Sequence, residues 1–363
     1  VAPGSSASPG TSLYNDTIQY FLTWNNSSSN LRYTVETDVD FAFYTPATHF
    51  MSLVKRNFTS EYFEGQKVSD LSSSFFVPGE GWGNGKVNGV PGGITQTPAL
   101  ANPFRYSGAD APNGEFLALC VSASNAPPPV GAVYNHHLRL RLGNSATVIQ
   151  DTIFSGYKQI KTVATLPASE LGASSTAFYF DIIDDLNVDT DFQAFTYFQL
   201  KYARIPNFGG AQKIQFSVRN STTEAKTRLD IVAAGYSNPV VFLHGETPRL
   251  IPFVPNGTLH SMLIPNSSSG VEQSVVYSDD SQINTVSLTA VNGNGTFTDF
   301  AAIPGAADSS LLMVYHESLE TAVDNYEIYR ESIAGGSYNV IKANAEELYQ
   351  QFGGGIEKHI NGI

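Results

Sequence analysis

Length, composition and charge limit both the fold class and the kinds of function. The 363 residues suffice for two ordinary domains or one large all-β domain, and the single cysteine excludes an intrachain disulfide. No segment reaches the roughly 18 consecutive apolar residues that span a membrane. Residues 229–363 carry 4 Lys and Arg against 15 Asp and Glu, and together with a net charge of −13 this argues against nucleic-acid contact by that part.

Short strands separated by turns are predicted along most of the chain. Aromatic residues make up 12% and charged residues only 15%, and glycine, proline and asparagine, which suit turns, recur throughout. A helix is predicted at 343–352, where three glycines end it. This spacing indicates an all-β sandwich or barrel. The predicted strands are 17–24, 31–44, 116–121, 138–142, 147–154, 157–165, 176–183, 192–204, 213–219, 229–234, 240–243, 259–263, 272–277, 285–291, 296–301, 310–316 and 325–331.

Residues 114–143 form the most informative local pattern. An apolar run at 116–121 precedes a proline-rich turn, and 138–142 then alternates leucine with arginine. Because side chains alternate across a strand, the leucines share one face and Arg139 and Arg141 the other. We therefore predict a sheet with an apolar back and a basic front, and we take Arg139 and Arg141 as candidates to face a genome.

A later stretch repeats this pattern with the opposite charge. The predicted strand at 310–316 is followed by a polar turn and by a second one at 325–331, whose outward residues are mainly acidic. Residues 1–228 are nearly neutral, with 16 basic against 18 acidic residues. The contrast between the two strand pairs suggests an inside and an outside.

An acidic stretch between two predicted strands is a candidate calcium site. Asp185, Asn187, Asp189 and Asp191 alternate along it, so that an extended or looped backbone points several oxygens at one hard cation. The competing interpretation is a solvated acidic turn. No other cofactor is expected.

Catalytic patterns are lacking, and we expect no enzymatic activity. There is no Gly-x-Ser-x-Gly elbow, and Cys120 lies within a predicted strand. His136 and His137 are adjacent, so they point to opposite faces of one strand and do not ligate one metal within that sheet. A pair of acids for glycoside hydrolysis is not identifiable from the sequence.

Two stretches resemble a known family. Residues 114–143, preceded by NPFRYSGADAPNGEF at 102–116, look like the final pair of strands of a nodavirus-like shell domain, and 304–342 with the following short helix has a similar look. The chain thereby resembles coat proteins of small non-enveloped icosahedral viruses, a lineage that includes the bacilladnaviruses of diatoms. This resemblance implies a jelly-roll shell domain, a second β-rich projecting domain and a C-terminal tail.

The resemblance also implies domain boundaries, partners and a location. The expected parts are a shell at 1–150, a projection at 151–342, and a short helix and tail at 343–363. The projection could instead be inserted so that 304–342 returns to the shell, and two tandem jelly rolls are a third arrangement. The expected partners are many copies of the chain itself, an unidentified host receptor, and viral nucleic acid held mainly by a basic arm that is not in this sequence. The expected location is the virion.

The alternative hypothesis is a secreted, glycosylated β-sandwich that binds or hydrolyses carbohydrate. No signal peptide is recognisable at residues 1–10. The argument for this alternative is the set of Asn-x-Ser/Thr sequons. They lie at Asn15, Asn25, Asn26, Asn57, Asn220, Asn256, Asn266 and Asn294.

Overall fold

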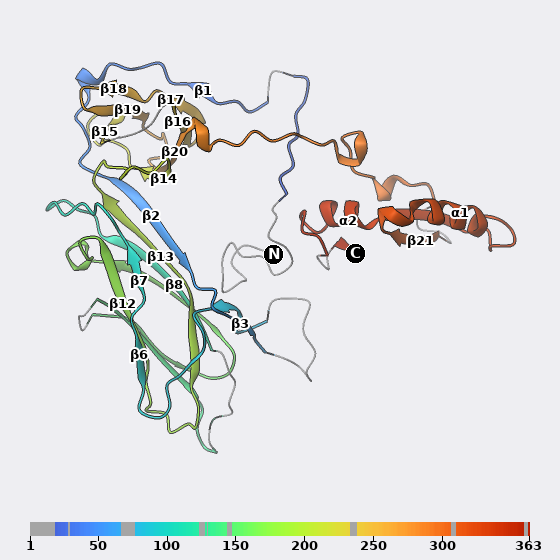
Figure 1. Ribbon diagram of the computed structural model, residues 1–363, viewed down its shortest axis with the longest axis horizontal. Coiled ribbons are helices and arrows are strands. Elements are labelled where there is room, and N and C mark those ends of the chain that lie inside the picture. Colours follow the sequence, from blue (N-terminus) through green and yellow to red (C-terminus); the bar gives the residue numbers. More distant parts are fainter. Residues whose placement is uncertain are drawn as a thin grey trace. The chain divides into compact units, whose positions relative to one another are not determined.

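The described residues form two compact units in a computed structural model (Figure 1). The first unit is built from Leu31–Asn284, and the second from Thr285–Ile363 with the described part of Thr11–Asn30. None of the helices in the described part of the chain has the length and apolar character needed to cross a membrane. The structure describes residues 19–27, 30–66, 77–122, 128, 130–143, 147–232, 238–305, 310–358 and 362–363.

Eight strand positions of the first unit form a jelly roll. One sheet has the order β2–β13–β8–β11, and the other has the order β6–β12–β9–β10, with β7 also paired to β12. Numbered along the chain, with β6 and β7 as one interrupted strand, these orders are 1-8-3-6 and 2-7-4-5, the two Greek keys of a jelly roll. The predicted all-β sandwich is confirmed. The strands are β2 (Phe50–Asn57), β6 (Ile94–Gln96), β7 (Ala99–Ala101), β8 (Gly114–Ser122), β9 (His136–Leu142), β10 (Val148–Phe154), β11 (Gln159–Leu166), β12 (Ser175–Ile182) and β13 (Phe192–Arg204).

Aromatic side chains fill the space between the two sheets. Phe116 of β8 stacks on Phe178 of β12 with ring centroids 4.3 Å apart, and Phe198 of β13 meets both rings edge-on. Phe180 and Phe195 extend the same layer. These inward residues belong to three strands, β8 and β13 of one sheet and β12 of the other, so the aromatic layer joins the sheets into one core.

The two strands of 114–143 are not a hydrogen-bonded pair. β8 pairs with β11 and β13, and β9 pairs with β10 and β12. The strands therefore lie in opposite sheets and face each other across the core. They are the third and fourth strands of the jelly roll, which corrects the expectation of a final strand pair.

A second sandwich follows the jelly roll in the chain. Its strands β17, β16, β20 and β14 extend the sheet that contains β2, so that one sheet runs through both sandwiches (Figure 1). The facing sheet has the order β15–β19–β18. Phe50, at the start of β2, lies in the second core with Phe208, Phe216 and Tyr277. The strands are β14 (Lys213–Val218), β15 (Lys226–Ile231), β16 (Pro239–His244), β17 (Arg249–Ile251), β18 (Val254–Asn256), β19 (Leu259–Pro265) and β20 (Gln273–Asp279).

The observed division of the chain differs from the expected boundaries. Position 150 lies within β10, where Asp151 is paired opposite Arg139 of β9. A boundary there would separate two neighbouring strands of one sheet. The second β-rich part instead begins after β13, and residues 304–342 belong to the second unit.

Residues 31–49 form an irregular strap on the second sandwich. Only β1 (Thr34–Val35) is a strand, parallel to β17, so the long strand predicted at 31–44 is wrong. Residues 31–49 are held to the second sandwich mainly by polar side-chain contacts and not by a continuous series of β-sheet hydrogen bonds. Smaller strands of the first unit are β3 (Glu61–Glu64), β4 (Glu80–Gly83) and β5 (Val87–Asn88), and its 3-10 turns are Phe41–Phe43, Ala168–Glu170 and Asp280–Gln282.

The second unit is a parallel strand pair with a helical crossover. β21 (Ser310–Tyr315) pairs with β22 (Asn339–Asn344), and α1 (Glu320–Glu331) connects them. The strand predicted at 325–331 is therefore wrong, because a parallel pair needs a long crossover, which is usually helical. The predicted helix is confirmed as α2 (Ala345–Gln351).

The remaining predictions for this unit concern its less regular segments. The predicted strands at 285–291 and 296–301 contain only the 3-10 turns Val291–Gly293 and Phe300–Ala302, and a third turn, Glu317–Leu319, precedes α1. The strand predicted at 17–24 is absent over the described residues 19–24.

Candidate functional site

The predicted two-faced strand lies in β9 of the jelly roll. Leu138, Leu140 and Leu142 are fully buried in the core. Arg139 and Arg141 lie on the outer face of the same sheet. The structure thus separates apolar and basic side chains as strand alternation requires.

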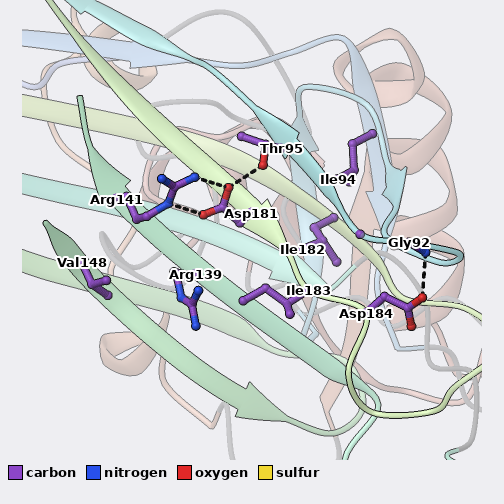
Figure 2. A pocket seen from close by; sticks show the side chains of 11 residues that line it. Gly92, Ile94, Thr95, Arg139, Arg141, Val148, Asp181, Ile182, Ile183 and Asp184 are labelled. Atoms are coloured by element: carbon purple, nitrogen blue, oxygen red, sulfur yellow. Dashed lines mark hydrogen bonds and ion pairs between the residues drawn. The ribbon is translucent and has the colours of Figure 1, made fainter. Parts of the chain in front are cut away.

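Acidic side chains of the neighbouring strands neutralise both arginines. Arg139 Nε lies 2.7 Å from Asp151 Oδ2 of β10. Arg141 donates from Nε and Nη2 to the two carboxylate oxygens of Asp181 on β12, at 2.6 and 2.8 Å. Thr95 Oγ1 also donates to Asp181, at 2.6 Å (Figure 2). The outer face is therefore a charge-matched surface, and contact of Arg139 and Arg141 with a genome stays a prediction that these ion pairs do not support.

The pKa of Asp181 follows from this pairing. Burial raises it, but hydrogen bonds from Arg141 and Thr95 and the charges of both arginines outweigh burial, so the pKa lies below its ordinary value. The pKa of Asp151 is lowered chiefly by the hydrogen bond from His137, with Arg139 adding to the effect. Both groups stay ionised near neutral pH, which suits ion pairing and not proton donation.

An open hollow of about 610 Å³ lies beside these ion pairs. Arg139, Arg141 and Asp181 line one side, and the loop before β6 lines the other, where the Gly92 amide donates to Asp184 Oδ2 at 2.7 Å (Figure 2). Ile94 and Val148 add apolar rims. The polar groups seen in this hollow are largely paired with each other, so the arrangement favours contact with a matching surface over capture of one charged ligand.

Two histidines fasten the acidic loop that follows β12. His137 Nδ1 lies 2.8 Å from Asp185 Oδ1, and its Nε2 lies 2.7 Å from Asp151 Oδ1. His136 is fully buried, and its Nδ1 lies 2.7 Å from Asp191 Oδ1. The sequence analysis placed these histidines on opposite faces of one strand, as observed, but no local signal links them to acids 14 to 55 positions away.

The calcium candidates are only partly brought together. Asp191 is buried and accepts hydrogen bonds from His136, from the His137 amide and from Gln193, whereas Asp185, Asn187 and Asp189 are exposed. Within the described ranges, no three His, Cys, Asp or Glu side chains gather as a metal-binding group. Calcium binding by this loop stays a prediction, and these contacts explain its acidity without a cation.

We call the contacts of His137 with Asp151 and Asp185 the His137 clamp. This clamp predicts that the stability of the first unit depends on pH. Burial lowers the pKa of His137, but its contacts to Asp185 and Asp151 outweigh burial and raise the pKa above 6.5. Other charged or titratable groups also lie near His137. Arg139 shares Asp151 with it, and His136 forms a buried pair with Asp191. A raised folded-state pKa means that the stabilisation is complete below the unfolded-state value and is lost as pH rises through the folded-state value.

We therefore expect the difference in unfolding free energy between the wild type and His137→Asn to shrink as pH rises above neutrality. Urea unfolding of both proteins over about pH 5 to 9 measures this difference, since that range brackets an imidazole pKa. A difference that stays constant over this range would contradict the clamp.

Comparisons with known proteins add little. No protein-family model matches the chain, and no curated protein matches it. Among solved structures, the chain is similar to dimeric latent PorU from Porphyromonas gingivalis, with TM-score 0.49, 11% identity and coverage of 90% of this chain and 28% of that one.

Two weaker likenesses are to a virus and to an enzyme. The infectious bursal disease virus Gx strain structure has TM-score 0.20 and 9% identity over 84% of this chain and 72% of that one. A Paenibacillus cycloisomaltooligosaccharide glucanotransferase in complex with cycloisomaltoheptaose has TM-score 0.15 and 7% identity over 65% and 45%. At these TM-scores the likenesses carry no argument about function.

Proposed function

We propose that this chain is the structural subunit of a non-enveloped icosahedral viral capsid, and that self-assembly around a viral genome, not catalysis, is its function. The observation that carries the proposal is the complete jelly-roll strand order of the first unit, an architecture used by viral shells. Its interior is a continuous core of aromatic and leucine side chains. A nodavirus-like lineage and a place in the virion are the finer parts of this proposal.

The other parts of the chain have roles in the same proposal. The second sandwich follows the jelly roll and begins the acidic portion of the chain, in which residues 229–363 carry a net charge of −11. Since a negatively charged protein surface is repelled by nucleic acid, we assign the second sandwich to the outward projection. In the described part of the second unit, a two-stranded sheet packs with α1 and α2 around a small apolar core of Val340, Ile341, Ala343 and Leu348. Contacts with neighbouring copies would stabilise it.

The carbohydrate hypothesis finds less support. A glycoside hydrolase needs one carboxyl group with a raised pKa, whereas the pKa values of Asp151 and Asp181 beside the hollow are lowered. The Asn220 and Asn266 amide nitrogens, which a glycan would occupy, donate hydrogen bonds to Ser267 O and Glu224 O at 2.7 and 2.8 Å. Sequon Asn15 lies outside the described residues.

Particle formation tests the proposal directly. We expect the purified chain to elute as a megadalton species in size-exclusion chromatography with light scattering, and to show closed shells by negative-stain electron microscopy. Salt and pH should be varied, because assembly of a charged subunit depends on both. A chain that stays monomeric under all these conditions would overturn the capsid proposal.

A further inference from the structure

Helix α1 of the second unit contacts its own sheet through charged side chains. Lys342 Nζ of β22 lies 2.7 Å from both Asp324 Oδ1 and Glu327 Oε2 of α1. No residue of α1 is buried. A surface helix normally turns its apolar stripe toward the core and its charges toward water, and α1 does the reverse.

The outward stripe of α1 has the spacing of a helix–helix contact. The members within the helix are Ala322, Tyr326 and Tyr329, which are separated by four and three positions, as in the heptad pattern of apolar seams. Tyr326 and Tyr329 are 48% and 50% exposed, and Leu319 and Ile333, just outside the helix ends, are 54% and 93% exposed. We call this set the α1 seam. It comprises Leu319, Ala322, Tyr326, Tyr329 and Ile333.

Contacts within the unit hold the aromatic part of the α1 seam in place. The rings of Tyr326 and Tyr329 stack, with centroids 6.1 Å apart and planes at 29°. The Arg330 guanidinium lies 4.5 Å from the ring of Tyr338 and 5.9 Å from that of Tyr326. Tyrosine and arginine are over-represented at binding hot spots, and prior ordering reduces the entropy lost on association.

The placement of charge favours a second copy as the occupant over a basic partner. A basic partner would be matched by acids along the rim of the seam, but the acids of α1 lie at other heptad positions. The positions that flank the seam are occupied by Val323, Asn325, Arg330 and Ser332, and the acids away from it are Glu320, Asp324, Glu327 and Glu331. Two such seams can therefore meet without the like-charge repulsion that the acidic composition would otherwise cause.

We propose that the α1 seam pairs with the α1 seam of a second copy, antiparallel across a two-fold axis. In this register Tyr326 faces Tyr329, and the small Ala322 lies opposite the end of the partner helix, beside the large Ile333. The inference rests on the proposed function in one respect. A seam of three turns buries less than the ~800 Å² per partner of a stable interface, so the contact depends on the local concentration that an assembly supplies.

Disulfide trapping tests this pairing cleanly. The only cysteine of the chain is Cys120, which is 1% exposed and whose burial raises the pKa of its thiol, so it does not compete. We expect full-length Ala322→Cys mixed with Ile333→Cys to give about tenfold more disulfide-linked dimer than Ala322→Cys mixed with Ile328→Cys. Ile328 is the matched control because it is 68% exposed but lies off the seam.

A further variant separates the contact from folding. Adding Tyr326→Glu to both trapping variants should abolish the dimer and leave thermal unfolding unchanged, because Tyr326 is on the surface. The pairing would be overturned if Ile328→Cys gave as much disulfide-linked dimer as Ile333→Cys, or if the dimer still formed with Tyr326→Glu present. If the variants form particles but no disulfide-linked dimer, the seam pairing is overturned and the capsid proposal stands. If the disulfide-linked dimer forms but particles never do, the capsid proposal is overturned and the seam pairing stands.

Discussion

Replacing Asp191 with alanine is expected to lower the free energy of unfolding of the first unit by about 3 to 5 kcal/mol, the cost of breaking a buried polar network by removing one partner. The Asp191 carboxylate is 1% exposed. It accepts from His136 Nδ1 at 2.7 Å, from the His137 amide at 3.0 Å and from Gln193 Nε2 at 2.9 Å. Alanine would leave these buried donors without their acceptor.

The neighbouring acid provides a matched control for this variant. Asp189 lies two positions earlier and is exposed, so Asp189→Ala should change stability by no more than about 0.5 kcal/mol. Urea unfolding followed by tryptophan fluorescence measures both variants. Equal effects of the two substitutions would show that the acidic loop acts through its overall charge and not through the Asp191 network.

Replacing Lys226 with methionine is expected to release the strap at 31–49 from the second sandwich. Lys226 Nζ lies 3.1 Å from Glu36 Oε1 and 2.8 Å from Asp38 Oδ2, and Glu36 is 7% exposed. Methionine keeps the length of the side chain but removes the ammonium group that pairs with Glu36. The Glu36 carboxylate then keeps the Thr37 and Asp38 amides at 3.0 and 3.1 Å and the Arg249 guanidinium at 3.4 Å. We estimate a local cost of about 2 kcal/mol, below the full value for a buried pair because Asp38 is solvated.

Hydrogen exchange detects this release. The Thr34 and Glu36 amides donate to Pro248 O and Leu250 O at 3.1 and 2.9 Å, so they should exchange about thirtyfold faster in the variant if the strap opens locally. Amides of β13 should be unaffected, and Lys213→Met on β14 is the control. Faster exchange throughout the first unit would mean global destabilisation and would contradict a separate strap.

The strands from β8 to β16 were predicted near their observed positions from local pattern, whereas β2 to β7 were not predicted. β13 was predicted with its observed limits, because Phe192–Arg204 is rich in aromatic residues, which favour strands. The burial of Leu138, Leu140 and Leu142 followed from alternation alone. These features depend on side-chain periodicity, which a single segment contains.

Local pattern failed where two conformations have similar periodicity. Tyr326 and Ile328 alternate with polar residues as in a strand, yet they belong to α1. The deciding interaction is distant: β21 and β22 pair in parallel, and a parallel connection needs a crossover. The same distance effect placed β8 and β9 in different sheets, although their sequence suggested one strand pair.

The sequence by itself determined the all-β class, the approximate positions of the strands from β8 to β16 and the two faces of β9, because these properties arise from residues close together in the chain. Only the tertiary structure decided the electrostatic character of the outer face. Asp151 and Asp181 come from strands on either side of β9 and neutralise Arg139 and Arg141. Strand register sets such pairings, and register is fixed by packing of the whole sandwich. A basic strand in the sequence therefore became a charge-matched surface in the fold.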